Sequence, residues 1–217
     1  MSWFKIYNLW RQPAPKNAVT TDKYLPYNSP TGGYDCFPLE WDKAIQESPS
    51  ASSCLSTIQD FIEGFGLSDP NLEKLVVNGK GETFWQIHHQ TVGSFSEYSG
   101  AYWLLRFNAL TNTTEWEVLP FENCRLGEPD SNGYISKIYY NPFFGTNEYG
   151  SNKKLTVCYD VYNPKSIKSQ MIAQKGEYKG QVMVIGEPTV RSRYYTFPKQ
   201  YSVVDWMKIE AGIADYH

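Results

Sequence analysis

Glu115 and Glu117 are the residues of this chain whose type and spacing come nearest to a catalytic pair. The two glutamates alternate with Trp116 and Val118, which is the period of a β-strand and puts both carboxylates on one face. Two neighbouring carboxylates could act as a general acid and a general base. The same alternation is typical of a half-exposed strand, and no glycine-rich or histidine-containing motif lies nearby. We therefore expect these glutamates to face solvent and to catalyse nothing.

Three other polar residues, His88, Glu122 and Arg125, could belong to an enzyme site. His88 and His89 are adjacent on a predicted helix, so they point to different faces, and a core or interface histidine is the favoured interpretation. An enzyme that uses Glu122, Arg125 or His88 would need a pocket that joins two of them and an acid with a shifted pKa. The chain has no G-x-x-x-x-G-K-[ST], G-x-S-x-G or H-E-x-x-H motif. We predict that it is not an enzyme and has no catalytic residue.

The cysteines do not form a metal-binding pattern. Cys36, Cys54, Cys124 and Cys158 are far apart, with no C-x-x-C pair and no histidine at metal-ligand spacing. We expect four free thiols that serve as small core residues, and no metal or cofactor site. No leading stretch reads as a signal peptide, so the reducing cytoplasm is the expected compartment in which the chain folds.

The composition indicates a folded protein that does not grip nucleic acid. Among the 217 residues, 41% are hydrophobic and 16% aromatic against 20% charged, the reverse of a disordered chain. The formal net charge of -3 disfavours tight binding to a phosphate backbone. No run approaches the ~18 consecutive apolar residues that a membrane span requires.

The elements that would position these residues fall into three segments. Residues 1–49 carry prolines at positions 13, 15, 26, 30, 38 and 49 and the turn Gly32-Gly33. They predict an extended, proline-rich N-terminal arm that lies on another surface, with a short helical turn around Leu39 to Ile45. Residues 50–197 predict an α+β domain, and residues 198–217 predict the start of a longer helix.

Two amphipathic helices are predicted in the α+β domain. The first begins near Ser50 with Ser50, Ser52 or Ser53 as its cap and ends at Gly64 or Gly66. Its apolar face is formed by Cys54, Leu55, Ile58, Phe61, Ile62 and Phe65. The second spans residues 82–98, with Phe84, Ile87, His88, Val92 and Phe95 on one side. A brief helical or mixed segment around residues 72–76 lies between them.

The rest of the domain is predicted to be a mixed or antiparallel sheet. Residues 102–107 and 115–119 alternate as a hairpin, and further strands are expected at 134–140, 155–162 and 181–185. In the last segment Ser202 could cap a helix that carries Val203, Trp206, Met207, Ile213 and Ala214 on its apolar face. No Gly or Pro stop precedes His217, so we expect a chain cut inside a longer helix, with a frayed terminus as the alternative.

Several strings in this order resemble the N-terminal portion of portal proteins of tailed double-stranded DNA bacteriophages, especially those of gut-bacterial prophages. The strings are Gly33-Tyr34-Asp35-Cys36-Phe37-Pro38, Ile62-Glu63-Gly64-Phe65-Gly66-Leu67, Gly100 to Phe107, Leu119-Pro120-Phe121-Glu122-Asn123-Cys124-Arg125-Leu126-Gly127, Tyr178-Lys179-Gly180-Gln181 and Tyr195-Thr196-Phe197-Pro198-Lys199-Gln200-Tyr201. The resemblance covers about residues 33–217. Members of the family continue well beyond this length, so the stem, clip and crown regions are missing here.

The resemblance implies a wing-like domain over residues 50–197 and a final helix that feeds the portal stem. It implies a structural subunit of the virion, which assembles as a dodecameric ring at one capsid vertex. The terminase would drive double-stranded DNA through this ring, without sequence-specific binding, and the tail connector would attach to it later. Its partners would be further copies of itself, the terminase, the capsid and the connector proteins, with no membrane contact.

The main alternative is a carbohydrate- or ligand-binding module. Seven Trp and seventeen Tyr could supply flat platforms on which sugars stack. Trp103, Trp116, Tyr139, Tyr140 and Tyr159 are the candidates for such a platform. This hypothesis requires most of these rings to be exposed on one face of the sheet.

Overall fold

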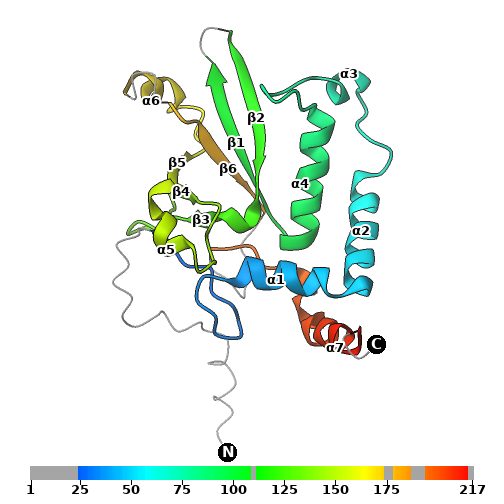
Figure 1. Ribbon diagram of the computed structural model, residues 1–217. Helices are drawn as coiled ribbons and strands as arrows, with labels where there is room; N and C mark the ends of the chain where they lie inside the picture. The colour runs from blue at the N-terminus through cyan, green and yellow to red at the C-terminus, as the bar shows by residue number, and fades with distance from the viewer. Residues whose placement is uncertain (1–23, 109–110, 174–177, 187–193, 215–217) are drawn as a thin grey trace, which may run out of the picture.

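The computed structural model describes residues 24–108, 111–173, 178–186 and 194–214, and it has a mixed α+β architecture (Figure 1). The helices are α1 (Phe37–Gln46), α2 (Pro49–Glu63), α3 (Pro70–Glu73), α4 (Phe84–Tyr98), α5 (Tyr149–Asn152), α6 (Ile167–Ala173) and α7 (Val204–Ala214). The strands are β1 (Ala101–Asn108), β2 (Thr113–Leu119), β3 (Cys124–Leu126), β4 (Lys137–Tyr140), β5 (Val157–Val161) and β6 (Gln181–Ile185). None of the helices within these ranges is long and apolar enough to cross a membrane.

The six strands form one mixed sheet in the order β2-β1-β6-β5-β4-β3. Neighbouring strands are antiparallel except β5 and β6, which are parallel. The predicted hairpin is confirmed, because Leu105 pairs with Trp116 and Arg106 with Glu115. β3 was not predicted as a strand: its three residues lie inside the string expected to be a corner, and three residues are too few to show an alternating pattern.

The first described segment differs from the predicted extended arm. Residues 37–46 form the ten-residue helix α1 instead of a short turn, since Pro38 occupies the first turn of the helix, where its missing N–H costs no hydrogen bond. Trp41 and Ile45 on this helix are buried. Residues 24–36 lie against the rest of the fold, since Tyr24 and Tyr27 are buried. Residues 1–23 lie outside the described residues.

Helices α2 and α4 begin at side-chain caps. Ser48, and not Ser50, Ser52 or Ser53, caps α2: its hydroxyl accepts a hydrogen bond from the Ala51 N–H at 3.2 Å, and Pro49 occupies the first turn. Ser48 was not predicted as the cap, because the helix was expected to begin near Ser50, after Pro49. Thr83 and Gln86 form a capping box at the start of α4.

The last helix begins later than predicted. Ser202 lies within a turn of 3-10 helix over Lys199–Val203, so it is not the cap, and α7 starts at Val204. The prediction that this helix is still running at His217 falls on residues 215–217, outside the described residues. Met207 of α7 is buried and joins the main apolar cluster.

That main cluster draws on all three predicted segments. Tyr27, Phe37 and Trp41 come from the first, Tyr102 and Leu126 from the sheet, and Met207 from the last helix. α4 packs against β1 and β2, and α2 packs on α4, so the helices form successive layers beside one edge of the sheet (Figure 1). α2 is therefore an outer helix, and this position decides what its faces can contact.

Candidate interaction surface

α2 turns a polar edge towards the rest of the protein. Gln59 and Glu63, one turn apart, contact α4: the Glu63 carboxylate lies 2.8 Å from His89 Nδ1, and Gln59 Nε2 lies 3.3 Å from the same nitrogen. Gln59 also donates to Glu63 at 2.7 Å. Burial acts to raise the pKa of Glu63, but the hydrogen bonds from His89 and Gln59 outweigh it and lower that pKa. The α2–α4 contact is thus hydrogen-bonded along this edge.

The apolar face of the same helix points outward. Ile58, Phe61 and Ile62 share one face of α2, and Phe65 lies just after the helix ends at Glu63. We call these four residues the α2 stripe. Their exposed fractions are 36%, 84%, 49% and 112%. Of the buried residues on α2, Leu55 is the one on this face, near the N-terminal end. The spacing predicted which residues share this apolar face and not its direction. The face is largely exposed because α2 contacts α4 through polar side chains.

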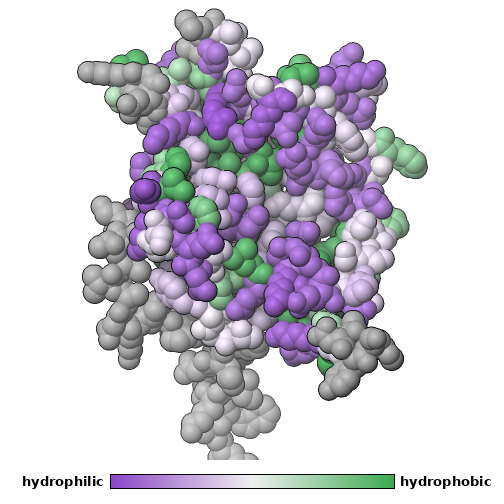
Figure 2. Space-filling model, viewed as in Figure 1, coloured by the Kyte–Doolittle hydropathy of each residue, from purple (hydrophilic) through white to green (hydrophobic). Residues whose placement is uncertain are grey.

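The exposed stripe is large for a monomer surface. An aromatic side chain contributes about 150–250 Å² of area when it is covered. Phe61 and Phe65 alone therefore approach the ~300–600 Å² of the largest apolar patch on a typical monomer. Covering each would stabilise a complex by about 1.5–3 kcal/mol before the costs of association. Leu75 and Val76, just after α3, are also exposed. In Figure 2, green atoms protrude at the right-hand edge, near the α2–α3 connection.

α7 has a second outward stripe. Trp206, Ile209 and Ile213, which we call the α7 stripe, are 72%, 54% and 59% exposed and share one helical face. The opposite side of the helix is anchored: Met207 is buried, and Glu210 accepts hydrogen bonds from the hydroxyls of Ser48 and Ser50 at the start of α2. The bond from Ser48 is the main cause of the lowered pKa of Glu210. α7 is docked on one face and open on the other.

Arg125, considered above as a catalytic candidate, is instead a buried structural charge. Its side chain is 0% exposed and forms an ion pair with Asp35, with Nε and Oδ1 2.5 Å apart. Its other nitrogens donate to the backbone carbonyls of Asp35, Cys124 and Glu122 at 2.8–2.9 Å. The Tyr27 N–H also donates to Asp35. These bonds engage all three guanidinium nitrogens and join residues 24–36 to β3.

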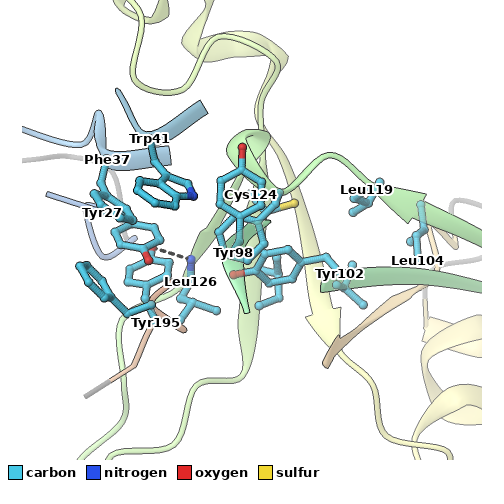
Figure 3. Packing of buried hydrophobic residues seen from close by; sticks show 14 of the residues in the cluster. Tyr27, Phe37, Trp41, Tyr98, Tyr102, Leu104, Leu119, Cys124, Leu126 and Tyr195 are labelled. Carbon is cyan, nitrogen blue, oxygen red and sulfur yellow. Dashed lines mark hydrogen bonds between the residues drawn. The ribbon is translucent and has the colours of Figure 1, made fainter. Parts of the chain in front are cut away.

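Tyr195 completes this junction (Figure 3). Its hydroxyl accepts from the Leu126 N–H at 3.0 Å and donates to the Leu25 carbonyl, and its ring stacks on Tyr27 at 4.1 Å between centroids. The Tyr27 hydroxyl donates to the Thr196 carbonyl. Phe37 stacks on Phe197 at 5.0 Å. Three strings that are far apart in the sequence, 33–38, 119–127 and 195–201, therefore meet at one place. The contact between these three strings was not predicted, because no feature of the sequence indicates it.

The other enzyme candidates, His88 and Glu122, have different surroundings. His88 is half-buried and stacks on Trp85, and its Nδ1 is buried with no hydrogen-bond partner among the described residues. Glu122 lies beside Arg125, and burial raises the pKa of its carboxyl. Glu117 is ion-paired with Lys80 at 2.6 Å and Arg106 at 3.0 Å. No group of three or more His, Cys, Asp or Glu able to hold a metal ion occurs within the described ranges.

The cysteines are free, as expected, but only one is a core residue. Cys124 is buried, Cys36 is half-buried, and Cys54 and Cys158 are exposed. Cys54 is exposed because it lies on the outer helix α2. Cys158 lies on β5, where burial alternates along the strand. All four cysteines were predicted to be core residues, which is wrong for Cys36, Cys54 and Cys158.

The aromatic rings proposed as a sugar platform are mostly packed against other groups. Tyr159 is buried, and Trp103, Trp116, Tyr139 and Tyr140 are half-buried. Trp103 contacts Trp116 at 5.1 Å between centroids and donates from Nε1 to Thr91 on α4. Trp116 also lines a cavity of about 210 Å³. The remaining lining residues are Leu105, Phe107, Thr114, Tyr162, Ile167, Tyr178, Gln181 and Met183.

No protein-family model matches the chain, and no curated protein sequence matches it. The two exposed stripes and the strings that meet at the Arg125 junction are therefore the features of this chain that bear on its function.

Proposed function

We propose that this chain is the front part of a phage portal subunit, a structural and non-enzymatic component of the virion. In this proposal the full subunit forms a dodecameric ring at one capsid vertex. DNA passes through the ring during packaging and ejection, and the terminase, the capsid and the tail connector contact it from outside. Residues 50–197 form the wing-like domain, and α7 leads to the stem.

The observation that carries the proposal is the pair of outward apolar stripes on two different helices. A ring built from head-to-tail contacts needs two different complementary surfaces on each subunit. The α2 stripe and the α7 stripe are separate surfaces, since α7 docks at the N-terminal end of α2 while Phe61 and Phe65 lie at the other end. A fifteen-residue helix is about 22 Å long. The chain thus has the number of contact surfaces that such an assembly requires.

Two further observations support the proposal. The strings that resemble portal proteins are joined by the Arg125–Asp35 ion pair and the Tyr195 hydrogen bonds, so they share one structural task. The net charge of -3 suits a channel wall that lets DNA pass without holding its phosphates.

The test is to express the gene with its downstream sequence restored and to image the product by negative-stain electron microscopy. We expect rings with a central hole. Well-behaved monomers from a complete reading frame would contradict the proposal. Sedimentation velocity on the same sample separates true rings from irregular aggregates, because rings sediment as one sharp species.

A ligand-binding module is the second candidate, and the cavity beside Trp116 is the observation that favours it. A space of about 210 Å³ lined by Phe107, Tyr162 and Tyr178 has room for one sugar ring or a small aromatic molecule. Titration of the protein with monosaccharides and with indole, followed by tryptophan fluorescence, tests this function. Saturable binding that a Trp116→Leu substitution abolishes would favour the module over the portal subunit.

A further inference from the structure

We propose that residues 1–10 of one copy of this chain bind the α2 stripe of a neighbouring copy. The proposal rests on the proposed function in one respect, because both require contacts between copies. It goes further in naming the segment that covers the stripe. Three properties of residues 1–23 favour this segment as the one that covers the α2 stripe: its apolar residues, its charge and the distance that it can span.

The first ten residues have the composition of a segment that binds an apolar surface. Seven of them are apolar or aromatic, namely Met1, Trp3, Phe4, Ile6, Tyr7, Leu9 and Trp10. The α2 stripe presents two nearly uncovered phenylalanine rings, Phe61 and Phe65. Aromatic side chains bury a large area at a small cost in rotamer entropy, so rings on both sides favour this contact.

The charges of the two partners are complementary. Residues 1–23 contain Lys5, Arg11, Lys16 and Lys23 against Asp22, a formal charge of +3. Residues 49–74, which include α2 and α3, contain Asp60, Glu63, Asp69 and Glu73 against Lys74, a formal charge of -3. Opposite charges around an apolar contact speed the encounter and fix its register. The contact should therefore weaken as salt is added.

The position of Tyr24 favours a neighbouring copy over the same chain. Tyr24 bridges to Gly127 beside β3 and packs against Phe144, at the opposite edge of the sheet from β2 and the α4–α2 layers (Figure 1). Phe65 follows α2, which packs on α4 beyond β2, so a same-chain contact must cross from one edge of the sheet to the helix layers beside the other edge. The thirteen residues 11–23 span about 45 Å when fully extended. A same-chain contact would need this segment to be stretched across the molecule, whereas a contact with a second copy needs no such extension.

The experiment is photo-crosslinking of the full 217-residue chain carrying Phe4→p-benzoylphenylalanine. Equal amounts of ¹⁵N-labelled and unlabelled protein are mixed, irradiated and digested, and crosslinked peptides are identified by mass spectrometry. We expect residue 4 to crosslink to the peptide that contains residues 58–65. About half of these crosslinks should join a labelled peptide to an unlabelled one if copies exchange freely.

Matched variants make the result specific. Phe61→Ser with Phe65→Ser should lower the crosslink yield at least about five-fold, whereas Ile172→Ser, which removes an equally exposed side chain on α6, should leave it unchanged. Lys5→Glu with Arg11→Glu should also lower the yield, and these positions lie outside the described fold. If the serine variant fails to keep the circular dichroism of the parent, the charge variant still decides the question.

The opposite outcomes are equally clear. Crosslinks confined to peptides of one isotope would place the segment on its own chain and overturn the proposal. Crosslinks to α7 or elsewhere, or none at all, would overturn it as well. This result is independent of the ring test. Mixed-isotope crosslinks, together with no rings from the longer gene, would contradict the portal function and still support this contact between copies.

Discussion

Arg125 illustrates how a single residue can hold distant segments together. Its guanidinium is fully buried, and Asp35 supplies the opposing charge from residues 24–36. Removing one partner of a buried ion pair leaves an uncompensated charge, which costs about 3–5 kcal/mol. We expect Asp35→Ala to lower the free energy of unfolding in urea by this amount.

The matched control for Asp35→Ala is Lys137→Met. Lys137 and Asp160 form a pair at the same distance, but their side chains are 49% and 23% exposed. An exposed pair contributes about 0–1 kcal/mol, since water and salt screen it. Similar losses in both variants would show that Arg125 and Asp35 are no more than a surface pair.

Glu97 gives a pH-dependent prediction at the same scale. Burial, together with the nearby charges of Asp42 and Glu122, raises the pKa of this carboxyl from 4.5 to about 7. A raised pKa in the folded state means that the folded protein binds more protons than the unfolded one between these values. The contribution to stability is therefore complete below about pH 4.5 and is lost as the pH rises through 7.

We expect thermal unfolding to show this loss. The parent should lose about 1–2 kcal/mol of stability between pH 5 and pH 8, a value reduced for the partial exposure of Glu97. Glu97→Gln should flatten the profile, because the amide does not titrate. Glu128→Gln, at an exposed carboxylate, is the control and should leave the slope as it was. A parent that gains stability across this range would contradict the burial argument.

At the scale of elements, the start of α2 depends on one serine. The Ser48 hydroxyl accepts from the Ala51 N–H and donates to Glu210 on α7, so it ties two helices together. Replacing a helix N-cap with alanine costs about 0.5–2 kcal/mol. We expect Ser48→Ala to lower the free energy of unfolding by at least 1 kcal/mol, and Ser53→Ala, at an exposed helical position, to change it by less than half of that. Equal effects would contradict the assignment of the cap.

The elements show what the sequence could predict and what it could not. The strand period at residues 101–119 and the existence of a helix near residues 82–98 depend on neighbours in the sequence, and both were predicted. The direction of the α2 stripe could not be predicted. It depends on the contacts of Gln59 and Glu63 with His89, which is thirty and twenty-six residues further along the chain. Spacing identifies which residues share a face, but it does not say whether that face meets the protein or the solvent.

At the scale of the whole molecule, the three predicted segments share one core in the described residues. Tyr27, Trp41, Leu104 and Met207 belong to one cluster, although they come from an expected arm, a domain and a final helix. Proline content predicted the irregular path of residues 24–36 but could not reveal the Asp35–Arg125 contact that buries them. This contact could not be predicted from the sequence, because Asp35 and Arg125 are ninety residues apart.

The α7 stripe supplies the last prediction, which belongs to the assembly. If α7 lies between subunits, covering Trp206 and Ile209 contributes about 3–6 kcal/mol to each contact, and a ring repeats that contact at every subunit. In the product of the gene with its downstream sequence restored, Trp206→Ser with Ile209→Ser should therefore shift most of the sedimenting material from rings to smaller species at micromolar concentration. Ile172→Ser, equally exposed on α6, should leave the ring fraction intact. An unchanged ring fraction in the α7 variant would remove α7 from the contact and leave the α2 stripe as the remaining candidate.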